Sequence, residues 1–179
     1  MDILYIIYLV IILLIASIYD LRYQKIPNLL TFPAMIIALV YYSLTAGLNG
    51  LVFSAGGLGL GIAIFIIPYL LGGMGAGDAK LMGAVGAVLG AQGVFNAVIF
   101  TVIIGGFYSI LLLIACQKNC RKFITSSALM VKTLAYTGKF ICIPLNEQEE
   151  KPKLCYGIAI AIGTLFTVWW KSAYNNLPI

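Results

Sequence analysis

The sequence predicts an all-α integral membrane protein, a bundle of about six transmembrane helices. Hydrophobic residues make up 62% of its 179 residues and charged residues only 9%, whereas a soluble domain carries about 25% charged residues. The mean hydropathy is +1.04. Apolar runs of about 17 to 22 residues fit the hydrocarbon core of a bilayer, and the strand-like alternation of membrane β-barrels is missing.

The apolar runs are separated by short polar or glycine-rich connections. They predict six spans, at Ile3–Tyr19, Leu29–Ala46, Leu51–Leu71, Ala79–Leu89, Val94–Ala115 and Leu154–Trp170. No basic region precedes the first run, which favours a retained span over a signal peptide. We therefore expect residues 1–179 to form one transmembrane domain.

A cytoplasmic or interfacial loop is expected at about residues 117–153. Within it, Phe123–Ile143 is moderately apolar but contains Lys132 and Lys139. This composition favours a segment that lies on the membrane surface. A seventh span is the alternative.

Basic residues alternate between the connections. Arg22 and Lys25 lie in the first connection, Lys80 lies in the third, and seven more lie in the fifth; the second and fourth have none. The positive-inside rule then predicts that the odd connections face the cytoplasm and that both termini lie outside. The net charge of +5 is thereby a feature of topology in the cytoplasmic (inner) membrane, and no nucleic-acid partner is expected.

The chain contains no histidine, which excludes Ser-His and Cys-His nucleophile systems and most zinc chemistry. Cys116 and Cys120 lack the usual Cys-x2-Cys spacing and have no matching second pair. Together with Cys142 and Cys155 they are expected to be reduced thiols near the cytoplasmic interface. We expect no metal and no cofactor.

Acidic residues are rare: the chain has six. Asp2 is at the N-terminus and three glutamates, at 147, 149 and 150, share one polar loop. That leaves Asp20 at the end of the first span and Asp78 at the start of the fourth. Since two spans lie between them, both return to the same membrane edge. An ionised carboxylate there is costly unless it has a function.

Each aspartate also has a structural interpretation. Asp78 could cap a helix N-terminus, where the helix dipole favours a negative charge, whereas the C-terminal position of Asp20 opposes one. Asp20 could instead pair with Arg22 or Lys25. Gly75 and Gly77, just before Asp78, let the backbone approach a partner closely or adopt positive φ.

Glycines also surround the short fourth span. The spacing of Gly83, Gly86 and Gly90 fits the small-residue rule for membrane helix contacts, which would let the first and fourth spans pack together. Ordinary bundle packing explains the glycines equally well.

Two adjacent carboxylates repel each other and share a proton, which separates their pKa values. One can then act as general base on a water and the other as general acid toward a scissile amide. This chemistry, that of an aspartic protease, needs neither histidine nor metal. The sequence does not assign the base.

Three motifs resemble the prepilin leader peptidases, membrane aspartic proteases of the GxGD type. Asp20 with Ile26–Asn28 is similar to the first catalytic motif, and Gly75–Leu81 (Gly-Ala-Gly-Asp-Ala-Lys-Leu) is similar to the second. Lys151–Gly163 resembles the start of the family's last span. The resemblance implies catalytic roles for Asp20 and Asp78, with Gly75, Gly77, Lys80, Pro27 and Asn28 as supporting motif residues.

The resemblance further implies the substrate: a prepilin-like protein with a basic leader and a hydrophobic helix, cut just after a glycine at the cytoplasmic face. Pro27 and Asn28 would start the second span and position Asp20. Lys80 would bias the charge of the pair, hold Asp78 at the interface, or only anchor the helix. No N-methyltransferase activity is expected, since the Cys-x-x-Cys region of larger members is missing. Bacterial prepilin and archaeal preflagellin branches stay open, as does the oligomeric state.

Two other functions fit membrane acids. A small transporter is one, because intramembrane carboxylates mark ion paths, although no inverted repeat is evident. A non-catalytic subunit of a pilus or secretion assembly is the other.

Overall fold

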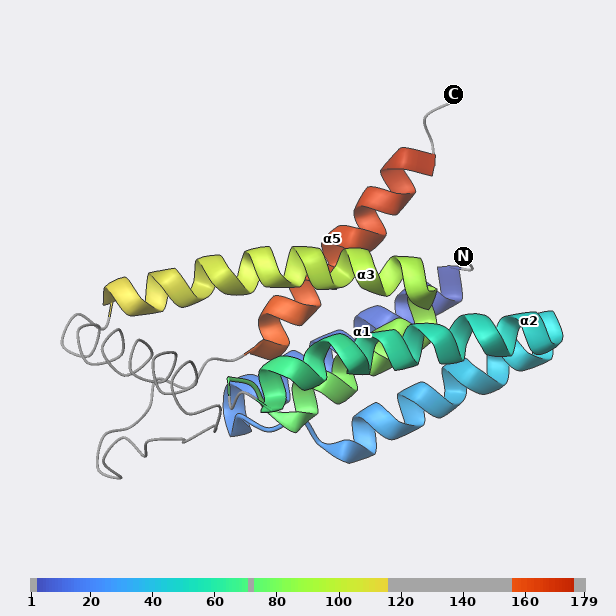
Figure 1. Ribbon diagram of the computed structural model, residues 1–179, viewed down its shortest axis with the longest axis horizontal. Helices are drawn as coiled ribbons and strands as arrows, with labels where there is room; N and C mark the ends of the chain where they lie inside the picture. The colour runs from blue at the N-terminus through green and yellow to red at the C-terminus, as the bar shows by residue number, and fades with distance from the viewer. Residues whose placement is uncertain (1–2, 71–72, 116–155, 176–179) are drawn as a thin grey trace, which may run out of the picture. The chain divides into compact units, whose positions relative to one another are not determined.

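The computed structural model describes residues 3–70, 73–115 and 156–175, and all of the secondary structure in these ranges is helical (Figure 1). The helices are α1 (Ile3–Tyr23), α2 (Asn28–Leu70), α3 (Ala76–Ala115) and α5 (Tyr156–Asn175). Three of them, α1 to α3, are long and apolar enough to cross a membrane. The described part of the chain is thus all-helical, and its long apolar helices fit an integral membrane protein, as the sequence predicts.

The predicted number of six separate helices is not supported. The expected second connection is replaced inside α2 by one non-helical residue, Gly47 (φ 60°), and the expected fourth connection is replaced inside α3 by Gly90 (φ 73°). Figure 1 shows α2 turning back on itself at its far end. Tyr42 and Phe53, on either side of that turn, bring their ring centroids within 5.1 Å. Glycine permits both turns because positive φ costs it little.

The ends of the helices follow from local chemistry. Helix α1 ends four residues beyond the predicted Tyr19, where Gln24 adopts positive φ (51°) and its N–H donates to the carbonyl of Asp20 (2.9 Å). This is the left-handed C-terminal cap that commonly terminates helices. Pro27 directly precedes α2, and its carbonyl accepts the N–H of Leu30 (3.0 Å).

Gly90 divides α3 into two legs, and the first leg, before Gly90, lies in the core. Every residue from 81 to 90 is buried, which is the pattern of a helix covered on all sides by others. The second leg of α2, after Gly47, packs against it with the two backbones in direct contact at two places. Gly57 faces Gly86, and a Cβ on Gly61 would stand 2.5 Å from the carbonyl oxygen of Met82. The predicted glycine contacts therefore join α3 to α2 and not to α1.

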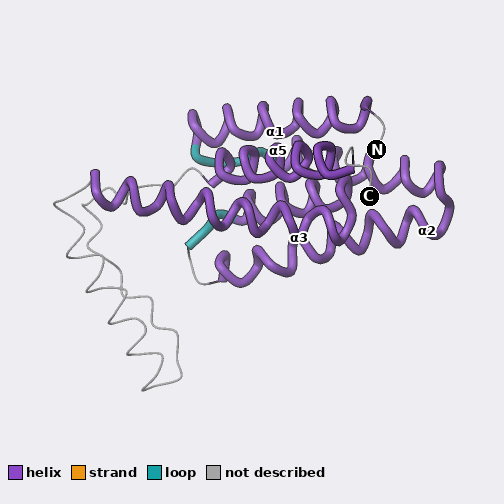
Figure 2. Tube along the Cα trace, turned by 90° about the horizontal axis from the view of Figure 1, so that it is seen from above, coloured by secondary structure: helices purple, strands orange, loops and turns teal. Residues whose placement is uncertain are grey.

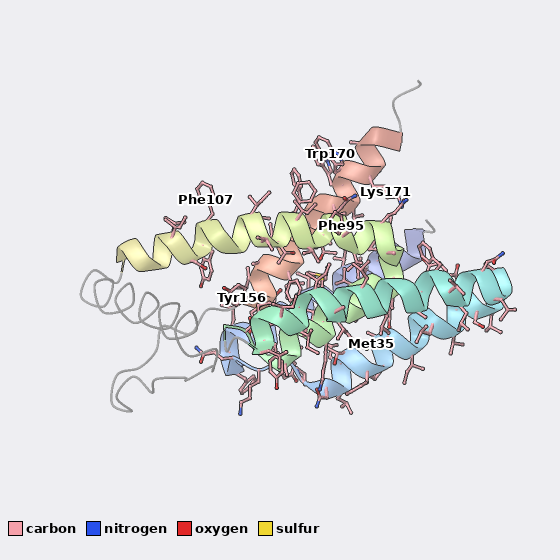
Figure 3. All side chains as sticks on the ribbon, viewed as in Figure 1. Met35, Phe95, Phe107, Tyr156, Trp170 and Lys171 are labelled. Carbon is pink, nitrogen blue, oxygen red and sulfur yellow. The ribbon has the colours of Figure 1, made fainter. Side chains whose placement is uncertain are left out.

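Helix α5 packs against α1, and Figure 2 shows the two helices running alongside each other. Tyr156 is at the beginning of α5, whereas Trp170 and Lys171 lie toward its other end (Figure 3). Trp169 and Trp170 are 61% and 51% exposed, as expected of aromatic residues at a membrane interface. The span predicted at Leu154–Trp170 corresponds to this helix, which is not among the three candidate spans.

By its contacts the chain divides into two units, Met1–Gly105 with Cys155–Ile179, and Gly106–Leu154. The first unit contains every residue predicted for the site. The single domain stays a prediction. The four cysteines, the glutamate cluster and the predicted surface segment Phe123–Ile143 lie outside the described residues.

Candidate active site

Asp20 lies in the last turn of α1 on the face that packs into the protein. It continues the buried stripe formed by Leu9, Leu13 and Ala16, and its side chain is only 6% exposed. This spacing is that of one face of an α-helix. The carboxylate therefore points into the bundle and not toward lipid.

The N-terminal end of α5 receives this carboxylate. The N–H of Gly157 donates a hydrogen bond of 2.8 Å to Oδ2 of Asp20. Gly157 is the second residue of α5, so its N–H has no partner within the helix. The partial positive charge of the helix N-terminus adds to this stabilisation of a negative group.

Asp78 is the third residue of α3 and is 7% exposed. Its Oδ2 accepts the N–H of Gly75 (3.1 Å), and its own N–H donates to the carbonyl of Gly75 (3.1 Å). A side chain at the third helical position that reaches back to the residue before the helix forms one half of a capping box. The predicted N-cap role of Asp78 is thus wrong in position: Gly75 takes the N-cap place.

Both carboxylates accordingly lie at helix N-termini. The prediction that they sit in opposing dipole fields is corrected, because Asp20 is in the last turn of α1 but its oxygen meets the beginning of α5. Gly77, directly before Asp78, lies against Ile26 in the connection that follows Asp20, so the two acids lie at the same end of the bundle. Together they form the aspartate pair, called the dyad below.

The beginning of α3 contacts both the α1–α2 connection and the first turns of α2. A Cβ on Gly77 would stand 3.0 Å from the Cβ of Ile26 and 3.4 Å from its backbone N and O. Two residues beyond Asp78, Lys80 Nζ donates to Oδ1 of Asn28 (2.8 Å) and lies 5.1 Å from the centroid of the Phe32 ring. These contacts join the segment that follows Asp20 to the segment that contains Asp78.

The supporting residues thus have distinct places. Gly75 bonds to Asp78, Gly77 permits the close approach to Ile26, and Pro27 precedes α2. Asn28 is the first residue of α2, as expected, and its side-chain oxygen accepts the bond from Lys80.

Gly157 has a part in the site that sequence reasoning did not assign. Its only signal was its place, just after the basic and proline-containing stretch that precedes the last helix. A contact between residues so far apart in the chain leaves no local pattern.

Two buried, hydrogen-bonded carboxylates at one end of a helical bundle can hold a water and exchange protons with it. In the part of the chain that the structure describes, no group of three or more His, Cys, Asp or Glu side chains could hold a metal ion. Two such carboxylates have the groups that general acid–base catalysis needs.

The sequence matches the type IV leader peptidase family over residues 7–110. The matched range is more than half of the chain and contains both aspartates and the Gly75–Lys80 segment. No curated protein and no solved structure matches the chain.

Proposed function

Because the chain belongs to the type IV leader peptidase family, we propose that it is a membrane aspartic endopeptidase whose dyad, Asp20 and Asp78, activates water. Membership of this family supports a peptidase activity and prepilin-like substrates. The observation that carries the mechanism is the burial of two carboxylates at one end of the bundle, each accepting a backbone N–H near a helix N-terminus.

In this mechanism the dyad holds one proton between two carboxyl groups. The ionised group takes a proton from the attacking water as its oxygen bonds to the scissile carbonyl carbon. The protonated group donates to the amide nitrogen as the carbon–nitrogen bond breaks. The titration belongs to the pair, and such a pair gives a bell-shaped dependence of activity on pH.

The substrate that fits this site is a precursor with a short basic leader, a glycine at the cut and a hydrophobic helix. We place the site at the cytoplasmic face of the inner membrane. Support for this side comes from Arg22, Lys25 and Lys80, basic residues at the same end of the bundle as the dyad. The apolar outer faces of the helices would accommodate the helix of the substrate within the bilayer.

The proposal is tested by cleavage of such a precursor by the purified protein in lipid nanodiscs. Asp20→Ala and Asp78→Ala should each lower the rate by about 100- to 10,000-fold, the usual worth of a positioned acid or base. Asp2→Ala, which removes an acid without a part in the mechanism, is the matched control and should cleave normally. Substantial processing by either dyad variant would exclude the mechanism.

A further inference from the structure

Gly157 lies so close to Asp20 that a residue with a side chain would not fit in its place. A Cβ on Gly157 would stand 2.8 Å from Oδ2 of Asp20, 3.0 Å from its Cβ and 3.1 Å from its Cγ. Real Cβ atoms essentially never approach another heavy atom closer than 3.0 Å. The same residue donates its N–H to Oδ2. The absence of a side chain and the hydrogen bond are therefore two parts of one contact.

Helix α5 has little freedom to withdraw from this contact. Farther along the helix, a Cβ on Gly163 would stand 2.7 Å from the backbone N of Thr101 and 2.8 Å from its Cα, so α5 crosses the second leg of α3 in direct contact with its backbone. Ile160, between the two glycines, is fully buried. A side chain at 157 would displace the carboxylate of Asp20 and not the helix.

We propose that Gly157 is a positioning residue of the dyad, one that sets the place and the ionised form of the Asp20 carboxylate through its N–H and its lack of a side chain. This inference rests on the proposed aspartic peptidase function. Gly157 lies outside the residues that match the family, so the assignment comes from the contact itself. In this arrangement α5 is a part of the active site and not only a membrane anchor.

The test compares the kinetics of Gly157→Ala with those of the wild type in nanodiscs. We expect kcat to fall about 100-fold, the usual cost of a small misplacement of a reacting group, with KM nearly unchanged. The acidic limb of the pH–activity profile should move toward higher pH, because a hydrogen bond to the ionised form of a carboxylate favours that form.

Two glycine variants serve as controls. Gly105→Ala places a Cβ at ordinary contact distances, 3.5 Å from Tyr156 and 3.6 Å from Ala159, and should leave kinetics and pH profile unchanged. Gly163→Ala presses on the backbone of Thr101, the other contact that holds α5, and should lower thermal stability. Normal kcat and an unmoved profile in Gly157→Ala would overturn the inference.

A stability measurement covers the case in which Gly157→Ala is too poorly folded for kinetics. If the added methyl group collides with the carboxylate, its cost in thermal stability should be smaller in an Asp20→Ala background. Equal costs in the two backgrounds would overturn the inference. Failure of the proposed function is recognised separately, since Asp20→Ala would then retain activity.

Discussion

Gly77 and Ile26 lie in direct contact, with 3.0 Å between the Cβ of Ile26 and the place where a Cβ on Gly77 would stand. Gly77 directly precedes Asp78 in the first turn of α3, and Ile26 belongs to the connection that follows the helix of Asp20. The glycine of the Gly75–Asp78 motif thus has a definite steric function: it lets one aspartate-bearing segment lie against the other.

Replacing Gly77 by alanine should lower cleavage activity about tenfold, which corresponds to about 1.4 kcal/mol in the barrier. The methyl group would press on Ile26 Cβ and, at 3.4 Å, on its backbone, so the α1–α2 connection must shift relative to Asp78. Gly73→Ala is the control, because its Cβ would make only an ordinary contact with the Pro68 carbonyl at 3.5 Å. Unchanged cleavage rates in Gly77→Ala would refute this role.

Packing of α2 against α3 should depend on the Gly57–Gly86 crossing. A Cβ on Gly86 would overlap the carbonyl of Gly57 and stand 3.2 Å from the N of Leu58, and no side-chain rotation can relieve a collision with backbone. Gly86→Ala should destabilise the fold by about 1–3 kcal/mol, the usual cost of overpacking. Thermal unfolding in nanodiscs measures this loss.

Gly56→Ala is the matched control for that measurement. Nothing lies within 4 Å of its added Cβ, and alanine is the better helix former. We expect its stability to equal or exceed that of the wild type. Equal unfolding temperatures for Gly56→Ala and Gly86→Ala would contradict the observed crossing.

Lys80 and Asn28 should affect the cleavage rate through the hydrogen bond between their side chains. Their hydrogen bond of 2.8 Å, which lies at the exposed surface, joins the beginning of α2 to the first turns of α3. Lys80→Met and Asn28→Ala should each lower the cleavage rate less than about tenfold. The double variant should be no worse than the poorer single one. If Lys80 acted by its charge on the dyad, Asn28→Ala would cleave at the wild-type rate and Lys80→Met would not.

Some features encoded in short stretches of the sequence were predicted correctly. Hydropathy identifies the apolar helices. The scarcity of acids draws attention to Asp20 and Asp78, whose catalytic roles stay predictions. The glycines before Asp78 indicate a close backbone approach, which the Gly77–Ile26 contact confirms. Each of these inferences needs only composition or the chemistry of a few neighbouring residues.

Contacts between distant segments were not predictable in this way. The bond between Asp20 and Gly157 depends on how α1 and α5 pack, and it reverses the expected electrostatic environment of Asp20. Gly47 and Gly90 were predicted to lie in four-residue loops, yet each is a single non-helical residue at a kink between two helical stretches. The position of Asp78 within α3 was missed because Gly75, without a capping side chain, precedes the helix.

The central claim is that Asp20 and Asp78 act as one unit on one peptide bond. The most direct measurement is the cleavage rate of Asp20→Asn, Asp78→Asn and the double variant, which preserve side-chain shape while removing the exchangeable proton. Residues that act as a unit lose nearly all of their joint contribution on the first substitution. The account predicts that each single variant is as inactive as the double one. Residual cleavage by a single variant, with a further multiplicative loss in the double, would contradict it.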